Sequence, residues 1–375
     1  MKSPAPPQPR SEVSSTDSPL KKHRALRYAR RILSWVIPVV ILTVVFLRID
    51  IGQLKSNIAH TNVVALVIGL SIFPIIILLG GMRWSTIVQS YSKTRLPKAF
   101  LLKKYWIGLA LGIFVPASLG WDIYRIVAVS KRFGKPIANI FAIFVEKGLA
   151  LLTMALLVVV LYPFAQRYLA APSTQVLKIV RFSYVALIAF ILLGIVAWLV
   201  FRNNAASIVV RNVERAFSRF LSAAVRRTKL NLKPEDTQFS IRGLLSPLVR
   251  PGNCGRIILF SFAIQFVSAV RDQVYLISLG YSLPFVVNLF LVPIFYFIFI
   301  LPISFGSLGI REATFILLYG LFGIPAEIAL LASFYNLLGL LLNIAIGGVV
   351  MLLDRPKVRP VQAERKEEPQ NEVPT

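Results

Sequence analysis

The chain has 375 residues, of which 56% are hydrophobic and only 15% are charged, and its mean hydropathy is +0.71. This composition excludes an ordinary soluble domain, because the apolar surface exceeds what a single core can bury. A formal net charge of +26 could indicate nucleic-acid binding, but the Lys and Arg residues lie between and beside the apolar runs, as in the cytoplasmic loops of membrane proteins. We therefore expect an all-α, polytopic transmembrane helical bundle without a nucleic-acid partner.

Residue types that hold metals and disulfides are scarce. The chain has one cysteine, Cys254, so no disulfide framework can form within it. Its two histidines, His23 and His60, have no Cys, His or acidic neighbour at the spacing of metal ligands. We expect no metal site and no cofactor.

The N-terminal segment changes character near residue 30. Residues 1–30 are rich in Pro and Ser and then in Lys and Arg, which predicts a disordered basic tail. The apolar run at 34–47 ends in Arg48 rather than in the small residues of a cleavage site, so we expect a retained first span. By the positive-inside rule the basic tail stays in the cytoplasm.

The next two apolar segments differ in length. Residues 63–81 can cross a membrane and would deliver Arg83 and the basic residues after it to the cytoplasmic side. Residues 105–115 are too few to cross before Pro116, and the segment that follows is basic again. A run that starts and ends on the positive side predicts a re-entrant hairpin.

The rest of the membrane domain, 31–353, contains further spans and one polar loop. The expected spans lie at residues 137–162, 178–201, 256–280, 284–301 and 326–353. The loop 202–255 has the pattern of a basic amphipathic helix, which either lies on an anionic membrane surface or covers the ends of the bundle. Residues 354–375 are charged and predicted to be disordered. We expect about seven to nine membrane segments and a multi-pass protein of the plasma (cytoplasmic) membrane with both termini in the cytoplasm.

A short motif occurs twice. PASLGWDIYR at 116–125 and PISFGSLGIRE at 302–312 share Pro-x-Ser-x-Gly, and each copy follows an apolar run and precedes an Arg with an acid nearby. Pro removes a backbone donor and Gly permits unusual dihedrals, so each copy predicts a broken helix. The predicted helix-breaking residues are Pro116, Gly120, Pro302, Gly306 and Gly309.

Both copies have the chemistry of an anion site. A helix that restarts after a break and is capped by Ser or Asp presents backbone amides to an anion, and Arg offers paired donors to a phosphate or carboxylate. The candidate substrate-binding residues are Ser118, Asp122, Arg125, Ser304, Arg311 and Glu312. The alternative interpretation is that each acid pairs with its Arg only to close the bundle.

The expected topology relates the two motif copies as an inverted repeat, an arrangement common in transporters, although one miscounted span would make them parallel. Four more ionisable residues lie inside apolar runs, where charges normally face a partner or a cavity: Glu146, Lys147, Arg271 and Asp272. Adjacent helical residues diverge by about 100°, so Glu146 and Lys147 should have separate partners. Polar stripes around Asp272 and Asn336 indicate either interhelical hydrogen bonding or a substrate path.

Four stretches resemble a known family: GMRW at 81–84, FVPASLGWDIYR at 114–125, VEKGLAL at 145–151 and LPISFGSLGIREA at 301–313. They are similar to the flippase-like membrane domain that also forms the membrane half of bacterial lysylphosphatidylglycerol synthases. Ala117, Trp121 and Ser307 stand where that family usually has Gly, whereas Asp122, Arg125, Gly309, Arg311 and Glu312 match its pattern. Glu146-Lys147 is similar to the family's acid–Arg pair.

The resemblance implies movement of a lipid or lipid-linked headgroup between leaflets, with an anionic phospholipid or a polyprenyl-phosphate-linked substrate as the partner. We expect no enzymatic activity, because the chain has no nucleophile elbow, paired histidines or acidic metal motif, and no soluble transferase domain follows the last span. Two alternatives stay open at this point: a membrane-embedded enzyme that modifies lipid headgroups, and a scaffold subunit of an envelope lipid enzyme.

Overall fold

The structure is a computed structural model that describes residues 49–91, 96–112, 119–133, 136–170, 251–300 and 308–354, with a few single positions between them. These residues form nine α-helices, a short 3-10 turn (η2, Gln166–Tyr168) and no strand. The α-helices are α2 (Ile51–Ala59), α3 (Val63–Tyr91), α4 (Lys98–Gly112), α5 (Leu119–Phe133), α6 (Pro136–Ala165), α10 (Pro251–Ser278), α11 (Phe285–Ile300), α12 (Ile310–Gly320) and α13 (Ala326–Leu353).

Four of these helices, α3, α6, α10 and α13, are long and apolar enough to cross a membrane. Their outward side chains are large and apolar, and Val64, Leu259 and Leu352 are between 65% and 77% exposed. Such a surface is stable against lipid and not against water. The expected polytopic helical bundle is therefore confirmed within the described residues.

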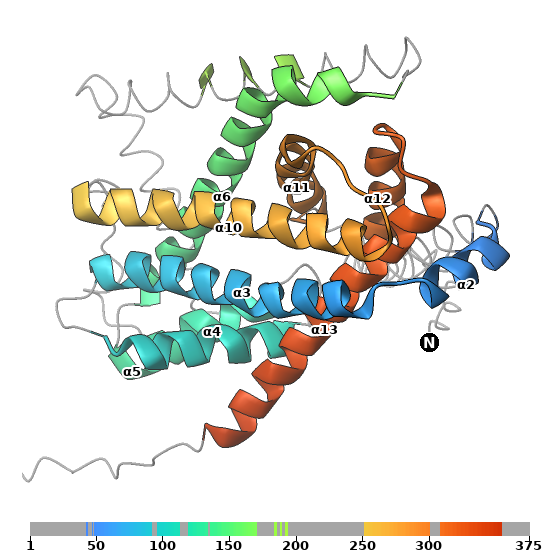
Figure 1. Cartoon of the computed structure of the whole chain (residues 1–375). Coiled ribbons are helices and arrows are strands. Elements are labelled where there is room, and N and C mark those ends of the chain that lie inside the picture. Colours follow the sequence, from blue (N-terminus) through green and yellow to red (C-terminus); the bar gives the residue numbers. More distant parts are fainter. Residues whose placement is uncertain are drawn as a thin grey trace, which may run out of the picture.

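The helices fall into two units of the same order, long–short–short–long: α3 to α6 and α10 to α13. The first long helix of each unit packs antiparallel against the other, as Figure 1 shows for α3 and α10. The Asn62 N–H donates to the Ser278 carbonyl at 2.7 Å at one end, and Asn253 Nδ2 donates to Ser90 Oγ at 3.1 Å at the other. Equivalent helices that run in opposite directions are what an inverted repeat produces.

Two further contacts between the units are equivalent, because a short helix of each unit packs on the last long helix of the other. Helix α4 packs on α13, and its counterpart α11 packs on α6. The α4–α13 contact is close, because a Cβ added to Gly347 would lie 2.4 Å from the Trp106 carbonyl oxygen. Lys104 of α4 also forms an ion pair with Asp354, which ends α13.

Helices α4 and α5 form a hairpin. Trp121 of α5 lies over Gly108 and Gly112 of α4, and a Cβ added to Gly108 would lie 2.6 Å from Trp121 Cδ1. Near the start of α4 and the end of α5, Lys104 and Arg132 both lie over the Phe100 ring, at 5.4 and 4.5 Å from its centroid. The hairpin therefore starts and finishes at the same end of the bundle, which is the geometry that the sequence predicted for a re-entrant segment.

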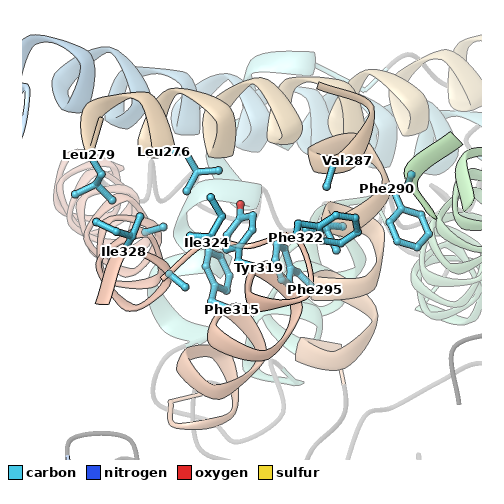
Figure 2. Packing of buried hydrophobic residues seen from close by; sticks show 14 of the residues in the cluster. Leu276, Leu279, Val287, Phe290, Phe295, Phe315, Tyr319, Phe322, Ile324 and Ile328 are labelled. Atoms are coloured by element: carbon cyan, nitrogen blue, oxygen red, sulfur yellow. The ribbon is translucent and has the colours of Figure 1, made fainter. Parts of the chain in front are cut away.

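The second hairpin consists of α11 and α12 and is held by aromatic stacking. Phe295 and Phe315 stack with centroids 4.4 Å apart, and Tyr319 meets Phe295 edge-on at 5.3 Å. Figure 2 shows this group facing Leu276 of α10 and Ile328 of α13. The sixteen residues of α11 are fewer than a full crossing needs, so α11 is not among the four long spans.

Two predicted boundaries were wrong. Helix α3 does not end with the predicted span at residue 81 but continues to Tyr91, so Arg83 is a buried residue inside the helix. Helix α10 begins at Pro251, inside the predicted loop 202–255. The tails 1–30 and 355–375, most of the first span, most of 178–201 and the amphipathic pattern at 211–226 lie outside the described residues.

Candidate functional site

Five charged side chains of alternating sign form a chain through the first unit, here called the charge ladder: Arg83, Glu146, Arg125, Asp122 and Lys147. Arg83 Nη2 lies 3.4 Å from Glu146 Oε1, and Arg125 Nη1 donates to Glu146 Oε2 at 2.8 Å. Arg125 Nη2 lies 2.5 Å from Asp122 Oδ1, and Lys147 Nζ lies 3.0 Å from Asp122 Oδ2. Each carboxylate thus bridges two cations.

Helix geometry explains how three short stretches supply this ladder. Asp122 and Arg125 are one turn apart on α5 and so share a face. Glu146 and Lys147 are neighbours on α6 and diverge by about 100°. Glu146 consequently reaches the Arg residues while Lys147 reaches Asp122, which are the separate partners that the sequence led us to expect.

The guanidinium of Arg125 is enclosed by aromatic rings. The ring centroids of Tyr105, Trp84 and Trp121 lie 4.9, 5.1 and 5.2 Å from its central carbon. Its side chain is 2% exposed, and its Nε has no hydrogen-bond partner among the described residues. Burial among rings strengthens its attraction to both carboxylates, because little water competes for it. Arg125 therefore links Asp122 to Glu146 at the centre of the charge ladder.

The charges of the ladder do not cancel. Three cations face two carboxylates, which leaves one excess positive charge. The Lys147 side chain, at one end, is 45% exposed, whereas those of Arg83 and Arg125 are 11% and 2% exposed. An approaching anion would find the excess charge at Lys147.

The second unit holds a group of charges that is balanced, here called the paired-charge site: Arg271, Asp272, Arg311 and Glu312. Arg271 Nη2 lies 2.6 Å from Asp272 Oδ1, and Arg311 Nη2 lies 2.6 Å from Glu312 Oε1. Helix α13 joins the two pairs, because Asn336 hydrogen-bonds Asp272 and Ser333 Oγ donates to Glu312 Oε1 at 3.4 Å. All four charged residues are at most 3% exposed. Within this group the polar stripes serve as interhelical hydrogen bonds.

The repeat relates the two sites residue by residue. Arg83 and Arg271 are each the twenty-first residue of their helix, α3 and α10. Each contacts a residue of the opposite helix: Arg83 Nη1 lies 3.4 Å from Ser261 Oγ of α10, and Arg271 lies 4.8 Å from the ring centroid of Phe73 of α3. Ser261 and Phe73 are equivalent too, because each precedes the Arg of its own helix by ten residues. Arg125 and Arg311 each follow the Pro of their motif by nine residues. The sites are therefore inverted counterparts.

The counterparts differ where the extra charge arises. Glu146 and Asn336 are each the eleventh residue of their helix, so an amide replaces the carboxylate in the second unit. The next residue is Lys147 in α6 and Leu337 in α13. The second unit thus lacks the exposed cation.

The described parts of the two motifs are the helices that restart after them. Helix α12 begins after Gly309, whose φ of 76° is the left-handed conformation expected at a break. The N-cap is therefore Gly309 and not Ser304 or Ser307, and the Gly309 N–H donates to Glu312 Oε2 at 2.6 Å. Gly120 is the second residue of α5. Five predicted residues lie outside the described residues: Pro116, Ser118, Pro302, Ser304 and Gly306.

Sequence reasoning did not include Arg83, Trp84, Tyr105 and Ser261 in the site. Arg83 was placed on the cytoplasmic side after the second span, although an Arg inside a long apolar helix is itself a signal of a buried partner. Tyr105 and Ser261 carry no such signal. Among the described residues no three His, Cys, Asp or Glu side chains lie close enough to hold a metal ion.

Comparison with known proteins agrees with this architecture. No curated protein and no solved structure matches the chain. The family model of the lysylphosphatidylglycerol synthase TM region matches residues 31–347, which contain both hairpins, the charge ladder and the paired-charge site. This chain, a multi-pass integral membrane protein, therefore belongs to the family of the lysylphosphatidylglycerol synthase transmembrane region.

Proposed function

We propose that this protein moves an anionic phospholipid, or a lipid-linked anionic substrate, between the two leaflets of the membrane. The observation that carries the proposal is the excess positive charge of the ladder, which ends in the half-exposed side chain of Lys147. An excess charge at membrane depth is unfavourable unless an anion balances it. The phosphate of a lipid headgroup is the anion that a membrane supplies.

The depth of Lys147 favours transport over surface binding. The span of α6 runs over Ile137–Tyr168, so Lys147 lies about five residues before its middle, or about 8 Å at 1.5 Å per residue. Half of the hydrocarbon core is about 15 Å thick. With the span centred in the membrane, a headgroup bound at Lys147 has therefore already entered the hydrocarbon core.

The residues of the ladder have different roles in this proposal. Lys147 contacts the substrate anion, while Asp122 and Arg125 position Lys147 through the 3.0 and 2.5 Å contacts. Arg311 and Glu312 belong to the balanced counterpart and stabilise the second hairpin. No nucleotide-binding loop occurs in the sequence, so transport would run down a gradient or use one.

The test is a lipid-translocation assay in proteoliposomes with fluorescent phosphatidylglycerol and a membrane-impermeant quencher. Lys147→Gln removes the charge that would pair with the phosphate, so we expect the rate to fall about tenfold or more, as loss of a charge-assisted hydrogen bond of about 1.5–3 kcal/mol implies. The matched control is Lys131→Gln, a second exposed lysine at the end of α5, which should leave the rate unchanged.

Other results would contradict the proposal. Equal rates for the wild type, Lys147→Gln and Lys131→Gln would rule out Lys147 as the substrate contact. Wild-type vesicles that match empty ones, combined with a new covalent lipid product in the extract, would indicate a headgroup-modifying enzyme. Wild-type vesicles without transport or product, together with co-purification of an envelope enzyme, would indicate a scaffold.

A further inference from the structure

The interface between α6 and α11 contains a cavity of about 380 Å³ that the charge ladder does not use. Its walls are Met154, Val158 and Tyr162 of α6, and Phe290 and Ile294 of α11, with side chains from the end of α12 behind them. Figure 2 shows Phe290 pointing toward α6, where its ring lies 6.1 Å from that of Tyr162. A cavity of this size with such a lining suits an apolar ligand.

We propose that this cavity binds one acyl chain of a membrane phospholipid. The length and depth of the cavity suit an acyl chain. The wall formed by α6 and the start of η2 runs from Met154 to Gln166, about 18 Å at 1.5 Å per residue, which is close to the ~15 Å of one leaflet's hydrocarbon layer. Met154 lies just past the middle of the Ile137–Tyr168 span, so the cavity occupies one half of the membrane.

The second argument is the polarity of the two ends. At the membrane surface the wall ends in Gln166, followed by Arg167 and Tyr168, all exposed. An Arg and a Tyr at a helix end are typical of the lipid headgroup level. Toward the middle of the membrane the lining is apolar. A phospholipid fits this gradient with its headgroup at Gln166 and its chain pointing to Met154.

The third argument comes from the counterpart interface, between α13 and α4. That interface is filled, because Gly347 brings α13 against the α4 backbone at Trp106, with no room for even one added carbon. The cavity is therefore not a general consequence of how these helices pack. It is also open to lipid at its edge, where Phe297 is 50% exposed.

The inference rests on the proposed function only for the identity of the transported lipid. Binding of the acyl chain depends on the apolar walls of the cavity. The occupant is an acyl chain of a glycerophospholipid. The same chain should therefore bind whether its headgroup is anionic or neutral, since selectivity for the headgroup belongs to Lys147, in the other half of the span.

The experiment uses phospholipids with a photoactivatable group in the acyl chain, incorporated into vesicles with the full-length protein. We expect label on peptides that contain 154–166 or 290–297, with phosphatidylglycerol and phosphatidylcholine alike. Val158→Trp fills the cavity and should reduce this label several-fold. Leu156→Trp, at a 41% exposed position of α6 outside the cavity, is the matched control and should retain it.

Ile294→Trp fills the cavity from α11 and should give the same loss, so that the result does not depend on one variant folding. A thermal melt of each variant shows which are folded. Undiminished label in a folded Val158→Trp or Ile294→Trp protein would overturn the inference, as would stronger displacement by polyprenyl phosphate than by unlabelled phospholipid. Lys147→Gln should slow transport about tenfold or more and leave the label intact, so failure of the two proposals can be told apart.

Discussion

Glu146 and Asn336 occupy the same position, the eleventh residue, in α6 and α13, two helices that the repeat relates. Glu146 accepts a hydrogen bond from Arg125, and Asn336 hydrogen-bonds Asp272. In the first unit the side chain is a carboxylate between two guanidinium groups; in the second it is a neutral amide beside a carboxylate. The substitution of an amide for an acid within one architecture gives the two halves different charge. The first half carries one excess positive charge, whereas the charges of the second half balance.

Glu146→Gln should strongly destabilise the protein. The change leaves Arg125 with one carboxylate partner and Arg83 with none among the described residues, and uncompensated buried charge typically costs about 3–5 kcal/mol. Thermal unfolding in detergent, followed by tryptophan fluorescence, should show a lower midpoint. Glu327→Gln, in the first turn of α13, makes the same chemical change away from the ladder and should have little effect. Similar shifts in both variants would contradict the central role of Glu146.

Arg311 tests the balance of the paired-charge site. Arg311→Met leaves Glu312 charged and buried, and should cost about 3–5 kcal/mol. The double variant Arg311→Met with Glu312→Gln removes both charges and keeps an acceptor for the Gly309 N–H, so it should be more stable than the single variant. Unfolding curves of the two proteins decide this, and a double variant that is less stable than the single one would show that the charges are needed individually.

The close contact of α13 with α4 can be tested at two adjacent glycines. Gly347→Leu would force side-chain atoms into the Trp106 backbone and push the helices apart, whereas a Cβ on Gly348 meets nothing within 4 Å. Gly347→Leu should lower the free energy of unfolding by about 1–3 kcal/mol or more. Gly348→Leu has the same change in volume and helix propensity, so it should be no less stable than the wild type. Equal destabilisation would mean that the contact is loose.

The sequence indicated which charged residues form the site better than it indicated which residues they contact. Hydropathy predicted the four described long helices, α3, α6, α10 and α13, in their order. The predicted span 284–301 is the shorter helix α11, and the predicted spans 34–47 and 178–201 lie mostly outside the described residues. The pairs Asp122–Arg125 and Arg311–Glu312 could be anticipated because their members are close in sequence. The contact of Arg83 with Glu146 could not, since it joins residues 63 positions apart and depends on how α3 crosses α6. The enclosure of Arg125 was hidden for the same reason: its rings come from three helices, α3, α4 and α5.

The sequence resemblance implies a Gly at the position of Trp121, and the structure gives the tryptophan a physical role. Its ring covers one face of Arg125 at 5.2 Å, and its Nε1 donates to the Tyr105 carbonyl at 3.1 Å. Trp121 also fills the space above Gly108 on α4. A glycine at this position would leave that space empty and one face of the guanidinium open.

Trp121→Gly should therefore lower the free energy of unfolding by about 3–5 kcal/mol through the lost side chain, and by about 1 kcal/mol more because Gly is a poor helix former. Trp121→Phe keeps the ring and loses only the hydrogen bond to Tyr105, so about 1 kcal/mol is expected. Thermal unfolding of the two variants measures the difference. If Trp121→Gly were as stable as Trp121→Phe, the ring would not be what closes Arg125, and the guanidinium would then be free to meet a substrate directly.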